Sequence, residues 1–242
     1  MKKLLITSLC LFGLAACDRN SDNFQPAAEI VPAPAPVMQE YQIEITNLTL
    51  AQPLSPIALI THDDRYRAFS IGDVASTGLE VLAEGGSNVD FLAEVDLEAG
   101  VFSTMSAAGP TFPGNTEVLN LSIEGDDVAG MMLSIVSMLI NTNDAITAVQ
   151  SLSIENLQPG EMMSVMSISY DSGTEANTEA LGTIPGPVDG GEGFNVLRDD
   201  LEDQIRGHSG VVTVDDGMPN SILGEMHRWD NPVARITITR TL

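Results

Sequence analysis

The sequence predicts a mainly β domain, a β-sandwich with minor helix, on three observations. Short segments alternate apolar and polar side chains, as strands with one buried face do. Two longer segments are almost continuously apolar, which is typical of strands covered on both faces. Turn residues separate these segments at short spacing, and this favours a sandwich of many strands over a helical bundle.

Five segments have these strand patterns. Alternation is clear in Ile43–Thr46 and in Ala234–Thr239, and it is weaker in Val118–Ile123. Met131–Ile140 is apolar except for two serines, so we expect a central strand covered on both faces. Met162–Tyr170 has a similar composition and leads to the same expectation.

Helix is expected around Thr77–Glu84, where Leu79, Leu82 and Ala83 share one face. Asn88–Val95 predicts a further turn or two of helix. Glycine, proline, asparagine and aspartate punctuate the remaining chain, as they do in turns. The clearest turn signals are Gly109-Pro110, Pro113-Gly114-Asn115, Pro159-Gly160, Asp189-Gly190-Gly191 and Asp215-Asp216-Gly217.

The N-terminus has the pattern of an export signal. Met1-Lys2-Lys3 is basic, Leu4–Leu14 is mostly apolar, and small residues then precede Cys17. The apolar segment is too short for a membrane-spanning helix, which needs about 20 such residues. We therefore expect residues 1–16 to be a signal peptide that is removed on export.

The run Leu14-Ala15-Ala16-Cys17 resembles the lipobox of bacterial lipoproteins. That resemblance implies a diacylglycerol on the Cys17 sulfur, cleavage before this residue and acylation of the new amino terminus. Several acyl chains on one residue bind a membrane far more stably than a single chain. The expected protein is exported and anchored to the bacterial cell envelope. The alternative is an ordinary secretory signal in which Cys17 is incidental.

Residues 17–40 are expected to form a linker after the lipidated cysteine. Two segments rich in proline and alanine, Gln25–Ala28 and Val31–Pro36, are typical of an extended, semi-rigid spacer. No later segment has the composition of a linker, so we expect one domain over residues 41–242. Cys10 and Cys17 are the only cysteines, so a mature domain has no disulfide and depends on its core.

The chain is strongly acidic, with 34 acidic against 10 basic residues and a formal charge of −24. Loss of the signal peptide would take this to −26, because Lys2 and Lys3 leave and no acidic residue does. Such a surface repels nucleic acid and anionic headgroups and attracts cations. Solubility or adaptation to a saline habitat would account for the acidity equally well.

Several kinds of catalysis are excluded or disfavoured by composition. A mature chain without lysine supports neither Schiff-base chemistry nor a P-loop. Gly207-His208-Ser209-Gly210 imitates a nucleophile elbow, but its second glycine is one residue early. No histidine pair has the spacing of a helical zinc protease site. We expect a protein that is not an enzyme.

Three segments resemble the spondin N-terminal domain in its bacterial form. The first is Ile45-Thr46-Asn47-Leu48-Thr49 with Gln52-Pro53-Leu54-Ser55-Pro56 and Thr61-His62. The second and third are Ser137-Met138-Leu139-Ile140-Asn141-Thr142-Asn143-Asp144 and Tyr170-Asp171-Ser172-Gly173-Thr174-Glu175. The closing run from His227 to Arg235 also suits that branch, so the resemblance spans nearly all of the mature domain.

The resemblance implies a C2-like antiparallel β-sandwich whose loops bind calcium. It places the metal-binding carboxylates on Asp144, Asp171 and Glu175. Calcium is a hard cation that takes six to eight oxygen ligands, so carboxylates in neighbouring loops suit it. Gly173 would allow the loop to turn sharply enough for the carboxylates of Asp171 and Glu175 to converge.

Two functions from different classes are therefore expected. The first is a lipid-anchored, extracytoplasmic binding or adhesion-type module that binds calcium and recognises a protein or glycan ligand. The alternative is a metal-dependent hydrolase that uses His62, Asp63 or His208 as metal ligands. Clustering of these histidines around an open metal site would favour the hydrolase.

Overall fold

The structure is a computed structural model that describes residues 37–125, 128–197 and 203–242. The predicted signal peptide, Cys17 and all but the last residues of the predicted linker lie outside the described residues. The fold is mainly β with two helices, so the predicted fold class is confirmed. Within the described residues, no helix has both the length and the apolarity to cross a bilayer.

The strands are β1 (Met38–Asn47), β2 (Ala58–His62), β3 (Val101–Ser106), β4 (Thr116–Glu124), β5 (Met132–Met138), β6 (Ala145–Ser153), β7 (Met162–Asp171), β8 (Arg206–Gly207) and β9 (Ala234–Arg240). The helices are α1 (Thr77–Gly85) and α2 (Val89–Val95). Two short 3-10 turns, at Val214–Asp216 and Glu225–His227, lie in the loops before β9.

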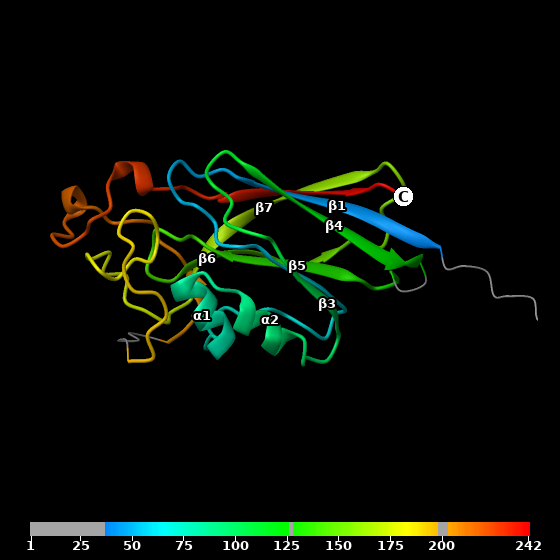
Figure 1. The fold of residues 1–242 in the computed structure, drawn as a ribbon, viewed down its shortest axis with the longest axis horizontal. Coiled ribbons are helices and arrows are strands. Elements are labelled where there is room, and N and C mark those ends of the chain that lie inside the picture. The colour runs from blue at the N-terminus through cyan, green and yellow to red at the C-terminus, as the bar shows by residue number, and fades with distance from the viewer. Residues whose placement is uncertain (1–36, 126–127, 198–202) are drawn as a thin grey trace, which may run out of the picture. The chain divides into compact units, whose positions relative to one another are not determined.

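All strand pairs are antiparallel, in the order β3-β2-β5-β6-β7-β9-β1-β4, with β8 on β7. Strand β7 belongs to both layers of the sandwich. Its first part, Met162–Ser167, pairs with β9, and its last part, Ile168–Asp171, pairs with β6. Figure 1 shows the layer of β1, β4, β7 and β9 above the layer of β3, β5 and β6.

The main core fills the space between the two layers. Alternate side chains of β1, Tyr41, Ile43 and Ile45, are buried there, as the predicted alternation requires. The core also contains Leu119, Leu121 and Ile123 from β4, Leu59 from β2, Leu133 and Ile135 from β5, and Ile236 and Ile238 from β9.

A second core lies between β2, β5, β6 and the helices. Leu79, Leu82 and Phe91 of the helices pack there against the outward side chains of the strands, such as Val136 and Met138 of β5. Strand β5 is therefore covered on both faces, as its composition predicts. In Figure 1 the helices lie along the face of this sheet that points away from β1 and β4.

Helix α1 begins and ends where local chemistry favours it. The Ser76 side chain accepts a hydrogen bond from the Leu79 amide, and Gly86 ends the helix at φ +73°. Both helices lie where the sequence predicts them. Leu79, Leu82 and Ala83 form the buried face of α1, which confirms their predicted helical spacing.

The prediction for Met162–Tyr170 is wrong in one respect. The segment is a strand, but only one face is buried, and Met162, Met166 and Ile168 are exposed. The helices cover the β2-β5-β6 sheet, so they leave the outer face of β7 in solvent. Strand β1 also begins at Met38, three residues before the predicted start of the domain at Tyr41.

The core makes a simple prediction about stability. Leu133 is 1% exposed between the layers, and Leu97 is 87% exposed after α2. Leu133→Ala should lower the free energy of unfolding by about 2–5 kcal/mol, because it removes buried methyl groups and leaves a cavity. Leu97→Ala should change that free energy by no more than about 0.5 kcal/mol. Urea unfolding of both variants measures this, and equal losses would contradict the assigned core.

Candidate functional site

Strand pairing brings the predicted carboxylates together at one end of the sandwich. Ala145, the first residue of β6, pairs with Asp171, the last residue of β7. The carboxylate of Asp144, one residue earlier, therefore lies beside the chain that leaves β7. The Ser172 amide donates to the Asp144 carbonyl at 3.4 Å, which continues the ladder by one step.

Asp144 is fully buried, and its two carboxylate oxygens differ in their surroundings. Oδ2 accepts hydrogen bonds from the Ser172 hydroxyl (3.0 Å) and from the amides of Thr174 (3.0 Å) and Glu175 (3.2 Å). Oδ1 is shielded from solvent and has no hydrogen-bond partner among the described residues. Burial, and then the negative charge of Asp171, raise the pKa of Asp144 to about 7.

Asp171 is 3% exposed, and three groups bind its carboxylate. Oδ1 accepts a hydrogen bond from the Gly173 amide at 2.9 Å, while Oδ2 contacts Asn177 Nδ2 at 2.7 Å and the Arg206 guanidinium at 3.2 Å. Arg206 therefore offsets part of the negative charge that two neighbouring aspartates create.

Two features of Gly173 explain why this position takes glycine. Its φ is +72°, a backbone conformation that costs glycine little and other residues more. A Cβ at this position would also lie 2.4 Å from the carbonyl oxygen of Gln204. The turn and the close approach of the chain before β8 thus hold the loop against Asp171.

His208 joins the two aspartates although sequence analysis did not assign it to their site. Strand β8 pairs with Tyr170 and Asp171, and the His208 amide donates to the Ser169 carbonyl at 3.3 Å. One ring nitrogen of His208 and one carboxylate oxygen of each of Asp144 and Asp171 all lie within 4.8 Å of one another. The ring also packs against Trp229, with centroids 5.2 Å apart.

The hydrogen bonds of His208 define its protonation. Nδ1 accepts a hydrogen bond from the Gly210 amide at 2.9 Å, so the neutral ring has its proton on Nε2. Nε2 is buried and has no hydrogen-bond partner among the described residues. Burial lowers the pKa of His208 to about 4, Asp171 opposes this, and Arg206 adds to it. At neutral pH the ring is therefore uncharged.

Glu175 lies in the same loop but has a different set of contacts. Its amide donates to Asp144, and its Oε1 accepts a hydrogen bond from Asn143 Nδ2 at 2.8 Å. Asn143 Oδ1 in turn accepts a hydrogen bond from the Glu179 amide at 2.9 Å. The group of three that encloses the candidate site contains His208 and not Glu175.

The arrangement suits a cation. Two buried carboxylates repel each other when both are charged, and a divalent ion between them would remove that cost. Asp144 Oδ1 is an acceptor that the described residues leave unsatisfied, and a buried polar atom of this kind is unfavourable. Asp144 and Asp171 can thus supply oxygen ligands, and backbone carbonyls or water would have to supply the others.

The structure separates His62 and Asp63 from His208, the third residue of the predicted hydrolase site. His62 is fully buried at the end of β2, where it pairs with Met132 at the start of β5. Asp144 comes shortly after Met138, at the other end of β5. The two ends of this strand are about 20 Å apart, because each residue of a β-strand adds about 3.3 Å. His62 and His208 therefore do not line one metal site.

Both ring nitrogens of His62 have hydrogen-bond partners. Nδ1 lies 2.6 Å from the Asp63 carbonyl and must donate to it, so Nε2 accepts from the Ser134 hydroxyl at 2.7 Å. The Asp63 carboxylate pairs with Arg65 at 2.6 Å. His62 thus forms a hydrogen bond with Ser134, one of the two serines in the otherwise apolar β5.

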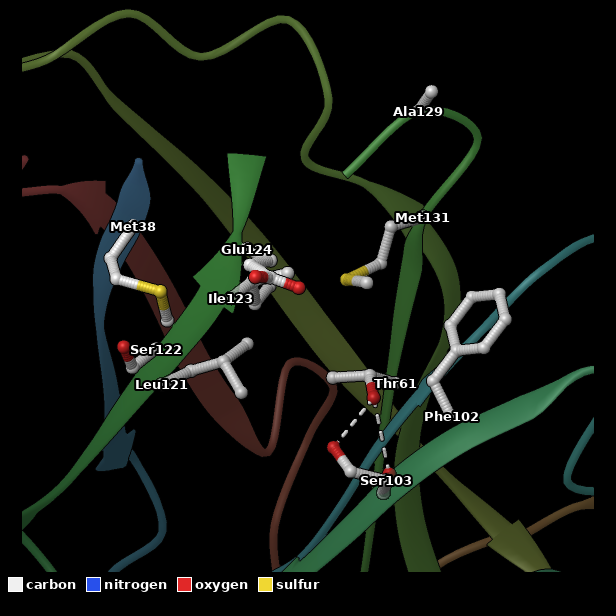
Figure 2. Close-up of a pocket in the computed structure, with 10 residues that line it drawn as sticks. All are labelled: Met38, Thr61, Phe102, Ser103, Leu121, Ser122, Ile123, Glu124, Ala129 and Met131. Carbon is white, nitrogen blue, oxygen red and sulfur yellow. Dashed lines mark hydrogen bonds between the residues drawn. The ribbon is translucent and has the colours of Figure 1, made fainter. Parts of the chain in front are cut away.

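A cavity of about 750 Å³ opens between the edge strands β3 and β4. In Figure 2 Met38 and Leu121 lie on one side of it, and Phe102 and Met131 on the other. Its polar groups include the Thr61 and Ser103 hydroxyls, which hydrogen-bond to each other at 2.7 Å. Met131 directly precedes β5, so this cavity lies at the end of β5 remote from Asp144.

Comparison with models of known protein families finds no match, and comparison with curated proteins finds no match either. The resemblance to the spondin domain accordingly stays a prediction from sequence. His208, Asn177 and Arg206 were missed as neighbours of Asp171 because they follow it by 6 to 37 residues without any repeated spacing. Only the pairing of β8 with β7 brings Arg206 and His208 to the site.

The raised pKa of Asp144 predicts a pH dependence in the metal-free protein. Its folded pKa of about 7 exceeds the ordinary value of 3.8 for an aspartate, so the stability that the neutral carboxyl provides is complete below about pH 4. That stability is lost as the pH rises through about 7. Relative to Asp144→Asn, wild type should become less stable over this range, by at most about 1.4 kcal/mol per pH unit.

Urea unfolding in a chelator at several pH values measures this difference. Exposed Asp64, near the other end of β5, provides the matched control, and Asp64→Asn should follow the wild-type profile. A constant difference between wild type and Asp144→Asn from pH 4 to 7 would contradict the assignment.

Proposed function

We propose that the chain is an exported, lipid-anchored binding module whose loops hold a calcium ion at one end of a β-sandwich. The observation that carries the proposal is the buried Asp144 carboxylate, which has one oxygen without a partner and lies beside Asp171. Asp144 and Asp171 are the proposed ligands. Glu175, the third residue expected from the sequence, stabilises the loop: its amide donates to Asp144 and its carboxylate accepts a hydrogen bond from Asn143.

Calcium fits these groups because it binds carboxylate oxygens and accepts irregular coordination. It also fits the strongly acidic composition, which attracts cations and repels nucleic acid. The ion would replace a repulsion between two aspartates by attraction to both, and would so fix the loop from Ser172 to Glu175. A fixed loop is a better binding surface, because less conformational entropy is lost when a partner binds.

The proposed partner is a protein or a glycan that meets the loops around this site. Strand β1 begins at Met38 and ends at Asn47, and Asn47 lies at the end of the sandwich where the site is. In Figure 1 the loops between β7 and β9 gather at this end, and β1 begins at the other. A chain tethered through Cys17 would thus enter the domain at the end remote from these loops.

The alternative of a metal-dependent hydrolase has less support. It would use His62, Asp63 and His208, but His62 is buried and fully hydrogen-bonded at the other end of β5. Asp63 is paired with Arg65 beside it. We therefore propose a binding function and no enzymatic one.

Calcium should stabilise the folded domain. Binding to the native state alone contributes RT ln(1 + [L]/Kd), about 2.7 kcal/mol at a hundredfold excess over Kd. Thermal unfolding in millimolar calcium should therefore show a melting temperature several degrees higher than in sodium at equal ionic strength. Asp171→Asn and Asp144→Asn should each remove most of this increment, and Asp64→Asn should keep it.

Equal losses in all three variants would mean that calcium only screens an acidic surface, and the proposed site would be wrong. Isothermal titration calorimetry of the folded proteins, over the same range of calcium concentrations for each, provides the second measurement. It should give one ion per wild-type chain at this site and none per Asp144→Asn chain.

The anchor has its own test. Cys17→Ser removes the sulfur that the lipid would occupy, so the variant should incorporate no labelled fatty acid and should leave the membrane fraction. Ser21→Ala, a change outside the lipobox, should behave as wild type. A Cys17→Ser protein that still incorporates lipid label and sediments with membranes would contradict the lipoprotein prediction.

A further inference from the structure

The ring of His208 has an unusual hydrogen bond for a histidine that lies next to two buried aspartates. Imidazole beside carboxylates is a common ligand set for zinc and other transition ions. A metal-binding histidine normally donates its other ring N–H to a carbonyl, a carboxylate or a water. In this structure Nδ1 meets a donor instead, because it accepts a hydrogen bond from the Gly210 amide at 2.9 Å.

This contact leaves the ring without a lone pair for a metal. The Nδ1 lone pair accepts the Gly210 hydrogen, and the remaining proton of the neutral ring is therefore on Nε2. Zinc could bind Nε2 only if that proton moved to Nδ1, where it would meet the Gly210 N–H. The packing of the ring against Trp229 and the pairing of the His208 amide with Ser169 hold the side chain in this position.

We infer that His208 is a selectivity residue, which offers no free ring lone pair to a cation at Asp144 and Asp171 and so favours hard, oxygen-coordinated cations over zinc. The inference rests on the proposed function, because it concerns the ion that the same site takes. Asp144 Oδ1, the unsatisfied oxygen of the site, remains a ligand for calcium whichever tautomer His208 adopts. Nε2–H is then available to donate to an oxygen, such as that of a water bound to the cation.

The tautomer can be measured directly. Long-range ¹H–¹⁵N correlation spectra of the histidine side chains should show the His208 proton on Nε2 without metal and with calcium. Zinc at an equal concentration should leave that pattern unchanged. A zinc-induced loss of the Nε2 proton, with the shift of a metal-bound nitrogen, would overturn the inference even if calcium binds as proposed.

Substitution provides the second test, by isothermal titration with calcium and zinc under reducing conditions. His208→Cys replaces the imidazole ring and its N–H by a thiolate, a soft ligand that zinc prefers. The zinc affinity of this variant should therefore rise relative to its calcium affinity by about tenfold or more. His208→Gln keeps an N–H donor and should keep the wild-type preference. His227→Gln is the matched control, because His227 Nδ1 also accepts a backbone hydrogen bond, from Gly224.

The outcomes separate the two proposals. Calcium binding with a zinc affinity that falls about tenfold or more in His208→Gln would keep the proposed function and overturn the selectivity role. Failure of both ions to bind at Asp144 and Asp171 would overturn the proposed function, and the selectivity role with it. Calcium binding that persists in His208→Gln, together with tighter zinc binding in His208→Cys alone, supports both.

Discussion

The pairing of β6 with the last residues of β7 is the constraint on which the candidate site depends. Strand β7 pairs with β9 in one layer up to Ser167 and with β6 in the other layer from Ile168. Its end, at Asp171, is thereby held against the start of β6, and Asp144 comes directly before that start. If β7 stayed in one layer, its loop would not meet the loop that contains Asp144.

That position has an electrostatic consequence. Asp144 and Asp171 are both buried, and burial disfavours a charged carboxylate unless partners compensate for lost water. The loop after β7 provides most of the compensation, through the amides of Thr174 and Glu175 and the Ser172 hydroxyl. Arg206 adds a positive charge beside Asp171. Of the carboxylate oxygens of these two aspartates, only Asp144 Oδ1 lacks a hydrogen-bond partner in the described part of the chain, and it is the oxygen that a cation would contact.

The loops around the site also explain the asparagines between β5 and β6. The side chains of Asn141 and Asn143 both form hydrogen bonds to residues of other loops. Asn141 donates to the Ala51 carbonyl and accepts from the Val188 amide. Asn143 connects Glu175 with Glu179. In this chain, side-chain amides thus hold together loops that are distant in sequence.

Local patterns were enough to predict most elements of the fold. The alternation in β1, the apolar composition of β5 and the helical spacing of α1 are set by residues within one element, so they are visible in the sequence. The same holds for Gly173, whose turn is a local requirement. The resemblance to the spondin domain predicted a shared site for Asp144 and Asp171, but neither the burial of these carboxylates nor the raised pKa of Asp144 was predicted.

Only the tertiary structure decided which faces are covered and which side chains join the site. The outer face of β7 is exposed because the helices cover the neighbouring sheet, and the composition of β7 contains no sign of this. His208 reaches Asp171 through the pairing of β8 with β7, although 37 residues separate the two in the chain. The sequence by itself determined strands β1, β4, β5, β7 and β9, the two helices and the acidic residue types, since these depend on short-range spacing, whereas β2, β3, β6 and β8 were not predicted. Partners across the sheet depend on long-range pairing, for which a single sequence has no periodic signal.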